Sequence, residues 1–272
     1  MTKKVSHTTH GKFPGTKLEG ADKYKKLYHY TSFESFVKIW LSKKLLFSKI
    51  EGMNDILEVN KKYSFELGTC RELIRGVIDK LNSFKQISFT MDYDSYIIGS
   101  MSTLMWGHYA TKGKGVCIEF DYSKLDIKDT IFEGEITYET YLPGPHFIPP
   151  SLTIEGLDDY FTKNQETIFF QKLKDWSGEN EYRLVSGKDD FLDISTAISA
   201  VYVTSNNSTE CILLEELLQG SDIPVMEFFF INNSSHGYIP NIRLAKSIRD
   251  QTEEARNNPN NLLNKLHAEV WK

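Results

Sequence analysis

The stretch Leu27-Tyr28-His29-Tyr30-Thr31-Ser32 decides how the folded part of this chain begins. Its aromatic first half is typical of a β-strand, and Ser32 is a residue type that caps helix N-termini. Apolar side chains then recur at helical spacing from Phe33 to Leu41, and two lysines precede the run Leu45-Leu46-Phe47-Ser48. We therefore expect a strand, a helix over residues 33–43 and a second strand over residues 45–48.

Beyond this unit, strand and helix patterns are mixed without the regular alternation of a doubly wound fold. Short apolar runs predict strands at residues 87–91, 116–120, 131–138, 181–185, 200–204, 225–231 and 236–243. Helical spacing predicts helices at 55–82, 102–110, 153–173 and 211–218, while prolines between 142 and 150 predict a loop. The pattern predicts an α+β fold with a mixed, largely antiparallel sheet and flanking helices.

Length and local composition divide the chain into three parts. Its 272 residues, 40% of them hydrophobic, are enough for a sizeable core. Residues 1–22 are polar, and we expect them to form a flexible N-terminal arm. We expect residues 23–245 to form a single α+β domain. Residues 246–272, broken by asparagines and a proline at 257–261, predict a helical C-terminal extension.

Charge and cysteine usage exclude several classes of protein. With 32 basic and 37 acidic side chains the net charge is −5, so extensive phosphate contacts with duplex nucleic acid are not expected. The three cysteines are far apart and form no CxxC pair, which predicts reduced thiols of a cytoplasmic protein. The sequence has no apolar run of about 18 residues and no metal-binding motif, so neither a membrane span nor a metal site is expected.

Three clusters combine aromatic and titratable residues. The first is His29-Tyr30-Thr31-Ser32, in which His29 and Thr31 share one face of the predicted strand. Such a pair at a strand end can bind the ribose and amide of a ligand. The alternative is a histidine held by the backbone next to a helix cap.

The second cluster is Met105-Trp106-Gly107-His108-Tyr109 on a predicted helix. Met105, His108 and Tyr109 lie three and four positions apart and therefore share a face. They are candidates for a stacking wall beside a nicotinamide or adenine ring. The alternative is a core anchor in which Trp106 and Tyr109 reach polar partners.

The third cluster is Glu179-Asn180-Glu181-Tyr182-Arg183, with Trp176 just before it. On a strand, Glu179, Glu181 and Arg183 recur at period two and line one face. One carboxylate can stabilise an oxocarbenium-like sugar while the other deprotonates an acceptor. The alternative is a surface ion pair worth about 0–1 kcal/mol.

Taken in order, these segments resemble a prokaryotic family, the domain of unknown function 2971 (DUF2971), over about residues 25–245. The segments that carry the resemblance are Leu27–Ser32, Leu46–Ser48 with Met53–Asp55, Met105–Tyr109 with Gly115–Ile118, Asp175–Trp176 and Glu179–Leu184.

DUF2971 in turn resembles a remote member of the ADP-ribosyltransferase superfamily. The opening of this chain is similar to that of DNA-targeting bacterial ADP-ribosyltransferase toxins. The resemblance implies an ADP-ribosyltransferase-like fold in which His29 holds the NAD ribose and nicotinamide and Glu181 is the catalytic glutamate. Glu179 matches the acceptor-side position of an ExE motif, and Ser48 is the candidate from the second strand. The segment Trp106–Tyr109 departs from that superfamily's pattern.

The resemblance predicts an NAD-using ADP-ribosyltransferase or NAD glycohydrolase without a metal, in a cytoplasmic bacterial toxin or phage-defence effector. NAD would be the substrate, and the acceptor an unidentified protein or nucleic acid. His29 and Glu181 should then face one cleft. The other candidate contacts with NAD are Tyr30, Thr31, Ser48, Trp106, His108, Tyr109, Trp176 and Arg183.

Two further hypotheses remain open. The first is a non-catalytic module of the same fold that binds a nucleotide or a phage component. The second is a nucleic-acid-processing protein that uses Lys112 and Lys114, although no clustered acidic metal site supports nuclease chemistry.

Overall fold

The computed structural model describes residues 25–55, 63–65, 69–93, 97–142, 146–149, 151–204, 208–233 and 237–245. The predicted N-terminal arm and C-terminal extension lie outside these residues. Within them the chain is a mixed α+β protein whose main sheet is mostly antiparallel, as the sequence pattern predicted. No helix of the described part is long and apolar enough to cross a membrane.

The chain divides into two compact units, each built from three segments. The first unit contains residues up to His29, Val37–Gly99 and Phe120–Ala197, and the second contains Tyr30–Phe36, Ser100–Glu119 and the residues from Ile198 onward. Strand β1 (Lys26–Thr31), helix α1 (Phe33–Ser42) and strand β6 (Val116–Asp121) each run from one unit into the other.

In the first unit the sheet order is β1, β5 (Lys85–Thr90), β11 (Glu181–Ser186) and β7 (Phe132–Glu135). These neighbours are antiparallel, and the short β3 (Ser48–Lys49) also pairs with β5. Tyr28 lies opposite Thr90, and Thr90 lies opposite Glu181. Strand β5 is thus the middle strand between the predicted His29 and Glu181 strands.

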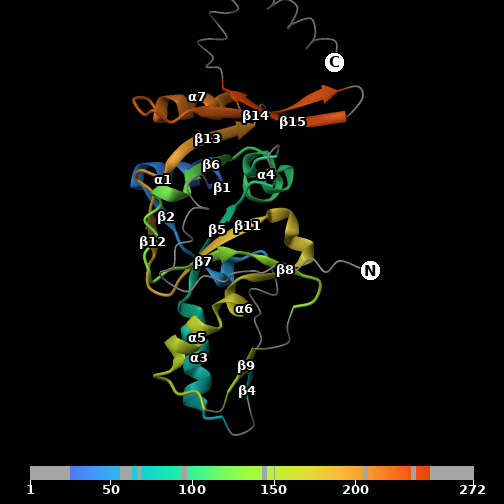
Figure 1. Ribbon diagram of the computed structural model, residues 1–272. Helices are drawn as coiled ribbons and strands as arrows, with labels where there is room; N and C mark the ends of the chain where they lie inside the picture. The colour runs from blue at the N-terminus through green and yellow to red at the C-terminus, as the bar shows by residue number, and fades with distance from the viewer. Residues whose placement is uncertain are drawn as a thin grey trace, which may run out of the picture. The chain divides into compact units, whose positions relative to one another are not determined.

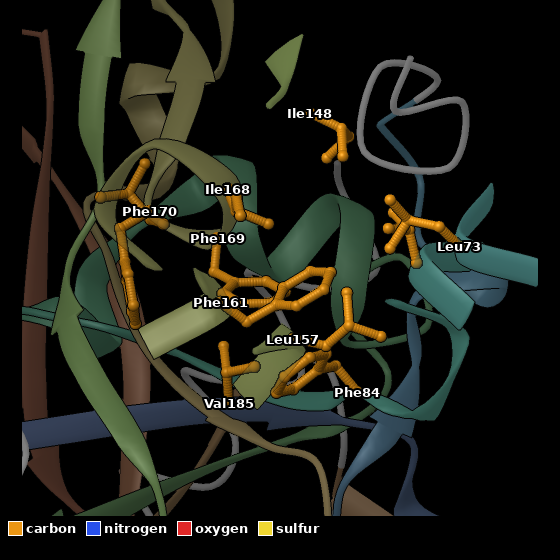
Figure 2. Close-up of a cluster of buried hydrophobic side chains, with 11 residues drawn as sticks. Leu73, Phe84, Ile148, Leu157, Phe161, Ile168, Phe169, Phe170 and Val185 are labelled. Atoms are coloured by element: carbon orange, nitrogen blue, oxygen red, sulfur yellow. The ribbon is translucent and has the colours of Figure 1, made fainter. Parts of the chain in front are cut away.

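One face of this sheet packs against α3 (Arg71–Ser83), α5 (Leu157–Lys163) and α6 (Gln165–Phe169), and α3 lies beside α5 (Figure 1). Their apolar sides meet in an aromatic cluster around Phe84, whose ring centroid is 4.7 Å from that of Phe169 and 5.3 Å from that of Phe161. Figure 2 shows Phe161 and Phe169 side by side above Val185 of β11. This cluster forms the hydrophobic core next to the candidate site.

Several predicted element bounds in the first unit were wrong. Within the helix predicted over 55–82, the described residues contain a strand, β4 (Tyr63–Phe65), and helix α3 begins at Arg71; β4 pairs with β9 (His146–Ile148), which lies in the predicted proline loop. The helix predicted over 153–173 is two short helices followed by β10 (Gln171–Leu173), because β10 pairs with β8 (Thr137–Glu139). The remaining elements of this unit are β2 (Lys44–Leu46), β12 (Phe191–Asp193) and the 3-10 helices Ile50–Gly52, Gly99–Met101 (which continues into the second unit), Tyr122–Lys124 and η4 (Lys174–Glu179).

The second unit contains the strand order β15 (Gly237–Leu244), β14 (Val225–Asn233), β13 (Ile198–Thr204) and β6. β13 and β14 are parallel, whereas β14 and β15 form an antiparallel hairpin, orange to red in Figure 1. Helix α4 (Thr103–Tyr109) begins at Ser102, whose side chain accepts a hydrogen bond from the Met105 N–H, and α7 spans Ser208–Leu217. The predicted strands and helices of this unit are all present.

Candidate functional site

Glu181 is the first residue of β11, and its carboxylate is bound on all sides by the first unit. Oε1 accepts hydrogen bonds from Ser88 Oγ at 2.6 Å and from Arg183 Nε at 2.7 Å. Oε2 accepts from Arg183 Nη2 at 2.9 Å and from Lys172 Nζ at 2.8 Å. Only 2% of Glu181 is exposed. Period-two spacing placed Glu181 and Arg183 on one face as predicted, but that face is buried.

The second carboxylate joins the same group through Lys172. The Lys172 ammonium is 2.7 Å from Glu179 Oε2 and therefore bridges Glu179 and Glu181. Arg183 is completely buried and also donates through Nη1 to the Phe169 carbonyl at 2.7 Å. We name these five residues, Ser88, Lys172, Glu179, Glu181 and Arg183, the Glu181 cluster. Its two carboxylates and two cations have a formal net charge of zero.

The neighbouring cations decide the protonation state of Glu181. Burial alone raises the pKa of a carboxyl group, but the charges and hydrogen bonds of Arg183 and Lys172 outweigh it and lower the pKa of Glu181 to about 2. Its backbone N–H donates to Tyr138 Oη at 2.9 Å, and burial raises the pKa of that phenol. Glu181 is therefore ionised at neutral pH and Tyr138 is not.

Glu179 is not on the predicted strand. It ends η4, and Asn180 then takes left-handed backbone angles (φ 44°, ψ 56°) before β11 begins. The Asn180 amide donates to the carbonyls of Met91 and Asp92 at 3.2 and 2.9 Å, which holds this sharp turn in place. The turn, rather than strand alternation, brings Glu179 towards Glu181.

His29 and Glu181 contact the same residue from two neighbouring strands. His29 Nδ1 is 3.1 Å from the Ser88 carbonyl, so Nδ1 carries the proton and donates, and Ser88 Oγ donates to Glu181. Burial lowers the pKa of His29, and the bond to Ser88 partly opposes this, which favours the neutral imidazole.

The expectation that His29 and Glu181 face one cleft needs correction. Tyr28, Thr90 and Glu181 are opposite one another in the register and share a sheet face. Strand alternation therefore assigns His29 to the other face, where its ring meets the edge of Phe89 at 6.0 Å. His29 connects to Glu181 through Ser88.

The residue from the middle strand is Ser88, which the sequence analysis missed. Ser48 was the predicted candidate, but it lies on β3, opposite Gln86, and is exposed. Ser88 belongs to residues 87–91, which were predicted only as a strand. The signal was a hydroxyl residue within a strand that pairs with the Glu181 strand, and this pairing is a long-range contact that the sequence does not reveal.

Two further groups border the Glu181 cluster. The ring of Trp176, which is half-buried, lies with its centroid 5.4 Å from Lys172 Nζ, within cation–π range. Thr90 is completely buried on the face of Glu181, and its Oγ1 has no hydrogen-bond partner among the described residues. Trp176 was a candidate contact with NAD, and its ring lies beside Lys172 of the cluster.

The remaining predicted contacts belong to the second unit. Trp106 is 3% exposed, donates its ring N–H to the Ser100 carbonyl at 2.8 Å, and stacks on Phe228 at 5.9 Å. Tyr30 is 6% exposed and meets the Trp106 ring edge-on at 5.2 Å. These contacts agree with the alternative interpretation of Trp106 as a core anchor, so its indole face does not form an open stacking wall.

Three other predicted residues lie at or near the surface of that unit. His108 is exposed, and Tyr109 and Thr31 are half-buried. The rings of His108 and Tyr109 are 6.2 Å apart, as expected of helix neighbours. The prediction that His108 forms part of a stacking wall has no support here, because His108 is exposed.

Comparison with family models gives a match to part of the chain. The family model described as a protein of unknown function (DUF2971) matches residues 105–184, so this part of the chain is similar to the family that the sequence resembles. The matched range begins within α4 and ends at Leu184, so it contains Glu179, Glu181 and Arg183. No curated protein and no solved structure matches the chain.

Proposed function

With the DUF2971 match as premise, we propose that this protein cleaves the nicotinamide N-glycosidic bond of NAD and passes the ADP-ribosyl group to water or to a macromolecular acceptor. The observation that supports this best is the link across three adjacent strands, in which Ser88 joins His29 of β1 to Glu181 of β11. The proposal includes an ADP-ribosyltransferase-like fold and a cellular role as a toxin or phage-defence effector.

Each group has a distinct task in this proposal. Glu181 is ionised and stabilises the positive charge that develops on the ribose as nicotinamide leaves. Ser88 fixes the orientation of that carboxylate, and His29 is a positioning residue that holds the Ser88 backbone. Glu179 orients or deprotonates the acceptor, and Trp176 stacks on a ring of NAD. NAD is a substrate here, and no metal takes part.

A second candidate, the non-catalytic binding module, is favoured by one observation. Both carboxylates are already bound to protein cations, and Glu179 and Glu181 are 4% and 2% exposed. A substrate contact needs part of this coordination to open. If it never opens, the Glu181 cluster is a structural ion network of a protein that binds its ligand elsewhere.

The deciding experiment incubates the pure protein with NAD and measures released nicotinamide. We expect release by the wild type and a loss of roughly 100-fold or more in Glu181→Gln, because the amide keeps the shape but removes the charge that the transition state needs. Glu133→Gln is the matched control, since Glu133 on neighbouring β7 also accepts hydrogen bonds, from Tyr122 and Tyr182.

The other outcomes separate the remaining possibilities. Glu179→Gln should keep nicotinamide release and lose labelling of an acceptor if the reaction is a transfer. Absence of release by the wild type, together with an unlabelled lysate, would favour the binding module. Thermal melts of each variant show whether lost activity reflects lost folding.

A further inference from the structure

The position of Lys172 suggests a role beyond that of an ion-pair partner. Its ammonium lies between two carboxylates, 2.7 Å from Glu179 and 2.8 Å from Glu181, and 5.4 Å from the centre of the Trp176 ring. Two carboxylates and an aromatic ring are the groups that recognise an organic cation in water-poor surroundings. The side chain of Lys172 is 7% exposed, so the surroundings are nearly dry.

The two cations of the cluster differ in how firmly they are held. Arg183 donates to both oxygens of Glu181 and to the Phe169 carbonyl, and its planar guanidinium fits this arrangement. Lys172 ends in a single ammonium on a flexible four-carbon stem, within the short strand β10. Rotation of this stem is the motion by which the ammonium would leave, with Arg183 remaining as the partner of Glu181.

An independent observation is a buried hydroxyl without a hydrogen-bond partner on the strand next to Glu181. Thr90 is completely buried, lies opposite Glu181 on the same face, and its Oγ1 has no partner among the described residues. Directly opposite side chains lie within roughly 5 Å at Cβ. A buried hydroxyl without a partner is costly, so a ligand or water that satisfies it would be stabilised there.

We propose that Lys172 is a built-in cation that closes the carboxylate pair, and that the place of its ammonium binds a compact organic cation once Lys172 has left it. The second part of this inference, that closure by Lys172 limits access to Glu181, rests on the proposed function. In the closed state the Lys172 ammonium bonds to both Glu179 and Glu181 and blocks their contact with a ligand.

The first test removes the lysine and returns its missing atoms as a probe. Lys172→Ala lacks the three outer methylenes and the ammonium, which n-propylammonium replaces. We expect n-propylammonium to raise the variant's Tm by on the order of 3–5 °C at a tenfold excess over its Kd. The neutral n-propanol should have no such effect.

A matched variant distinguishes specific binding of n-propylammonium from a general salt effect. Lys85→Ala loses a partly exposed ion pair with Asp190 in the same unit, and n-propylammonium should not restore it. An equal Tm rise in both variants, or no rise in Lys172→Ala, overturns the inference. If Lys172→Ala folds only with n-propylammonium and not with n-propanol, that recovery is itself the expected result.

A second variant decides the case in which Lys172→Ala does not fold at all. Lys172→Met keeps the stem and lacks only the ammonium, so ammonium ion is then the probe and the larger tetramethylammonium its control. Stabilisation by ammonium alone supports the site, and equal responses to both ions contradict it.

Nicotinamide release then tests the closure. Lys172→Met should lower the KM for NAD by about tenfold and change kcat less, because it removes the group that competes for the carboxylates. An unchanged KM contradicts closure. If no variant cleaves NAD but the cations stabilise the variants selectively, the proposed function fails and the cation site stands.

Discussion

Two buried groups arose from the predicted candidate motifs: the Glu181 cluster of the first unit, and the aromatic stack of Trp106 with Tyr30 and Phe228 in the second. They are stabilised differently. Trp106 satisfies its single polar atom with the Ser100 carbonyl and otherwise contacts the rings of Tyr30 and Phe228. Glu181 depends on two cations and a hydroxyl. Trp106 and Glu181 are buried to a similar degree. What distinguishes a core residue from a charged centre that can take part in chemistry is therefore the set of groups it contacts, rather than its exposure.

The largest effect expected in this comparison is that of Arg183→Met. Removing the guanidinium leaves Glu181 buried with Lys172 as its remaining cation, and breaking a buried pair typically costs about 3–5 kcal/mol of unfolding free energy. Urea denaturation of the variant measures this. Arg183→Lys should rescue little, since lysine cannot reproduce the two-oxygen contact. Stability equal to the wild type would contradict the importance of this pair.

For the aromatic stack, Trp106→Ala should also destabilise strongly, by about 3–5 kcal/mol, because it opens a cavity in the core. Trp106→Phe should cost less, as it keeps most of the ring contact with Phe228 and loses the hydrogen bond to Ser100. Thermal denaturation of both variants tests whether Trp106→Ala loses more stability than Trp106→Phe. An unchanged Tm in Trp106→Ala would mean that the indole is not part of the core.

The two regions should respond differently to acid. The pKa of Glu181 is lowered from 4.5 to about 2 in the folded protein, so its stabilising contribution is fully present above about pH 4.5 and is lost as pH falls towards 2. The contribution is on the order of 3 kcal/mol. Comparing urea midpoints at pH 6 and pH 3 for the wild type and Glu181→Gln measures it. The pH dependence should be smaller in Glu181→Gln and unchanged in Trp106→Phe.

The smallest effect is expected at His108. Its side chain is exposed, so His108→Ala should change the unfolding free energy by less than about 0.5 kcal/mol. Nicotinamide release, if the proposed function holds, should be unaffected as well. A large loss of activity with intact folding would restore His108 as a ligand contact.

The strand positions were predictable where local signals are strong. The strand around His29, the helix that follows Ser32, the buried strand over 116–120 and the strand that begins at Glu181 all lie where alternation and capping residues placed them. The helix predicted over 55–82 was wrong in its extent, because Tyr63–Phe65 forms the strand β4 and α3 begins at Arg71. Periodicity cannot separate these when the strand's partner, β9, is distant in sequence.

The sequence by itself determined the residue types of the candidate site: two glutamates and an arginine around residue 181, a tryptophan just before them, and an aromatic strand carrying His29. Only the tertiary structure decided what these residues do together. Pairing of β5 with both β1 and β11 made Ser88 the link and put His29 and Glu181 on different faces. The turn at Asn180 brought Glu179 to Lys172. The physical reason is that residue type and spacing fix local conformation, whereas the partner of a charge, and with it the pKa and accessibility of that charge, depends on strands that meet across long stretches of chain.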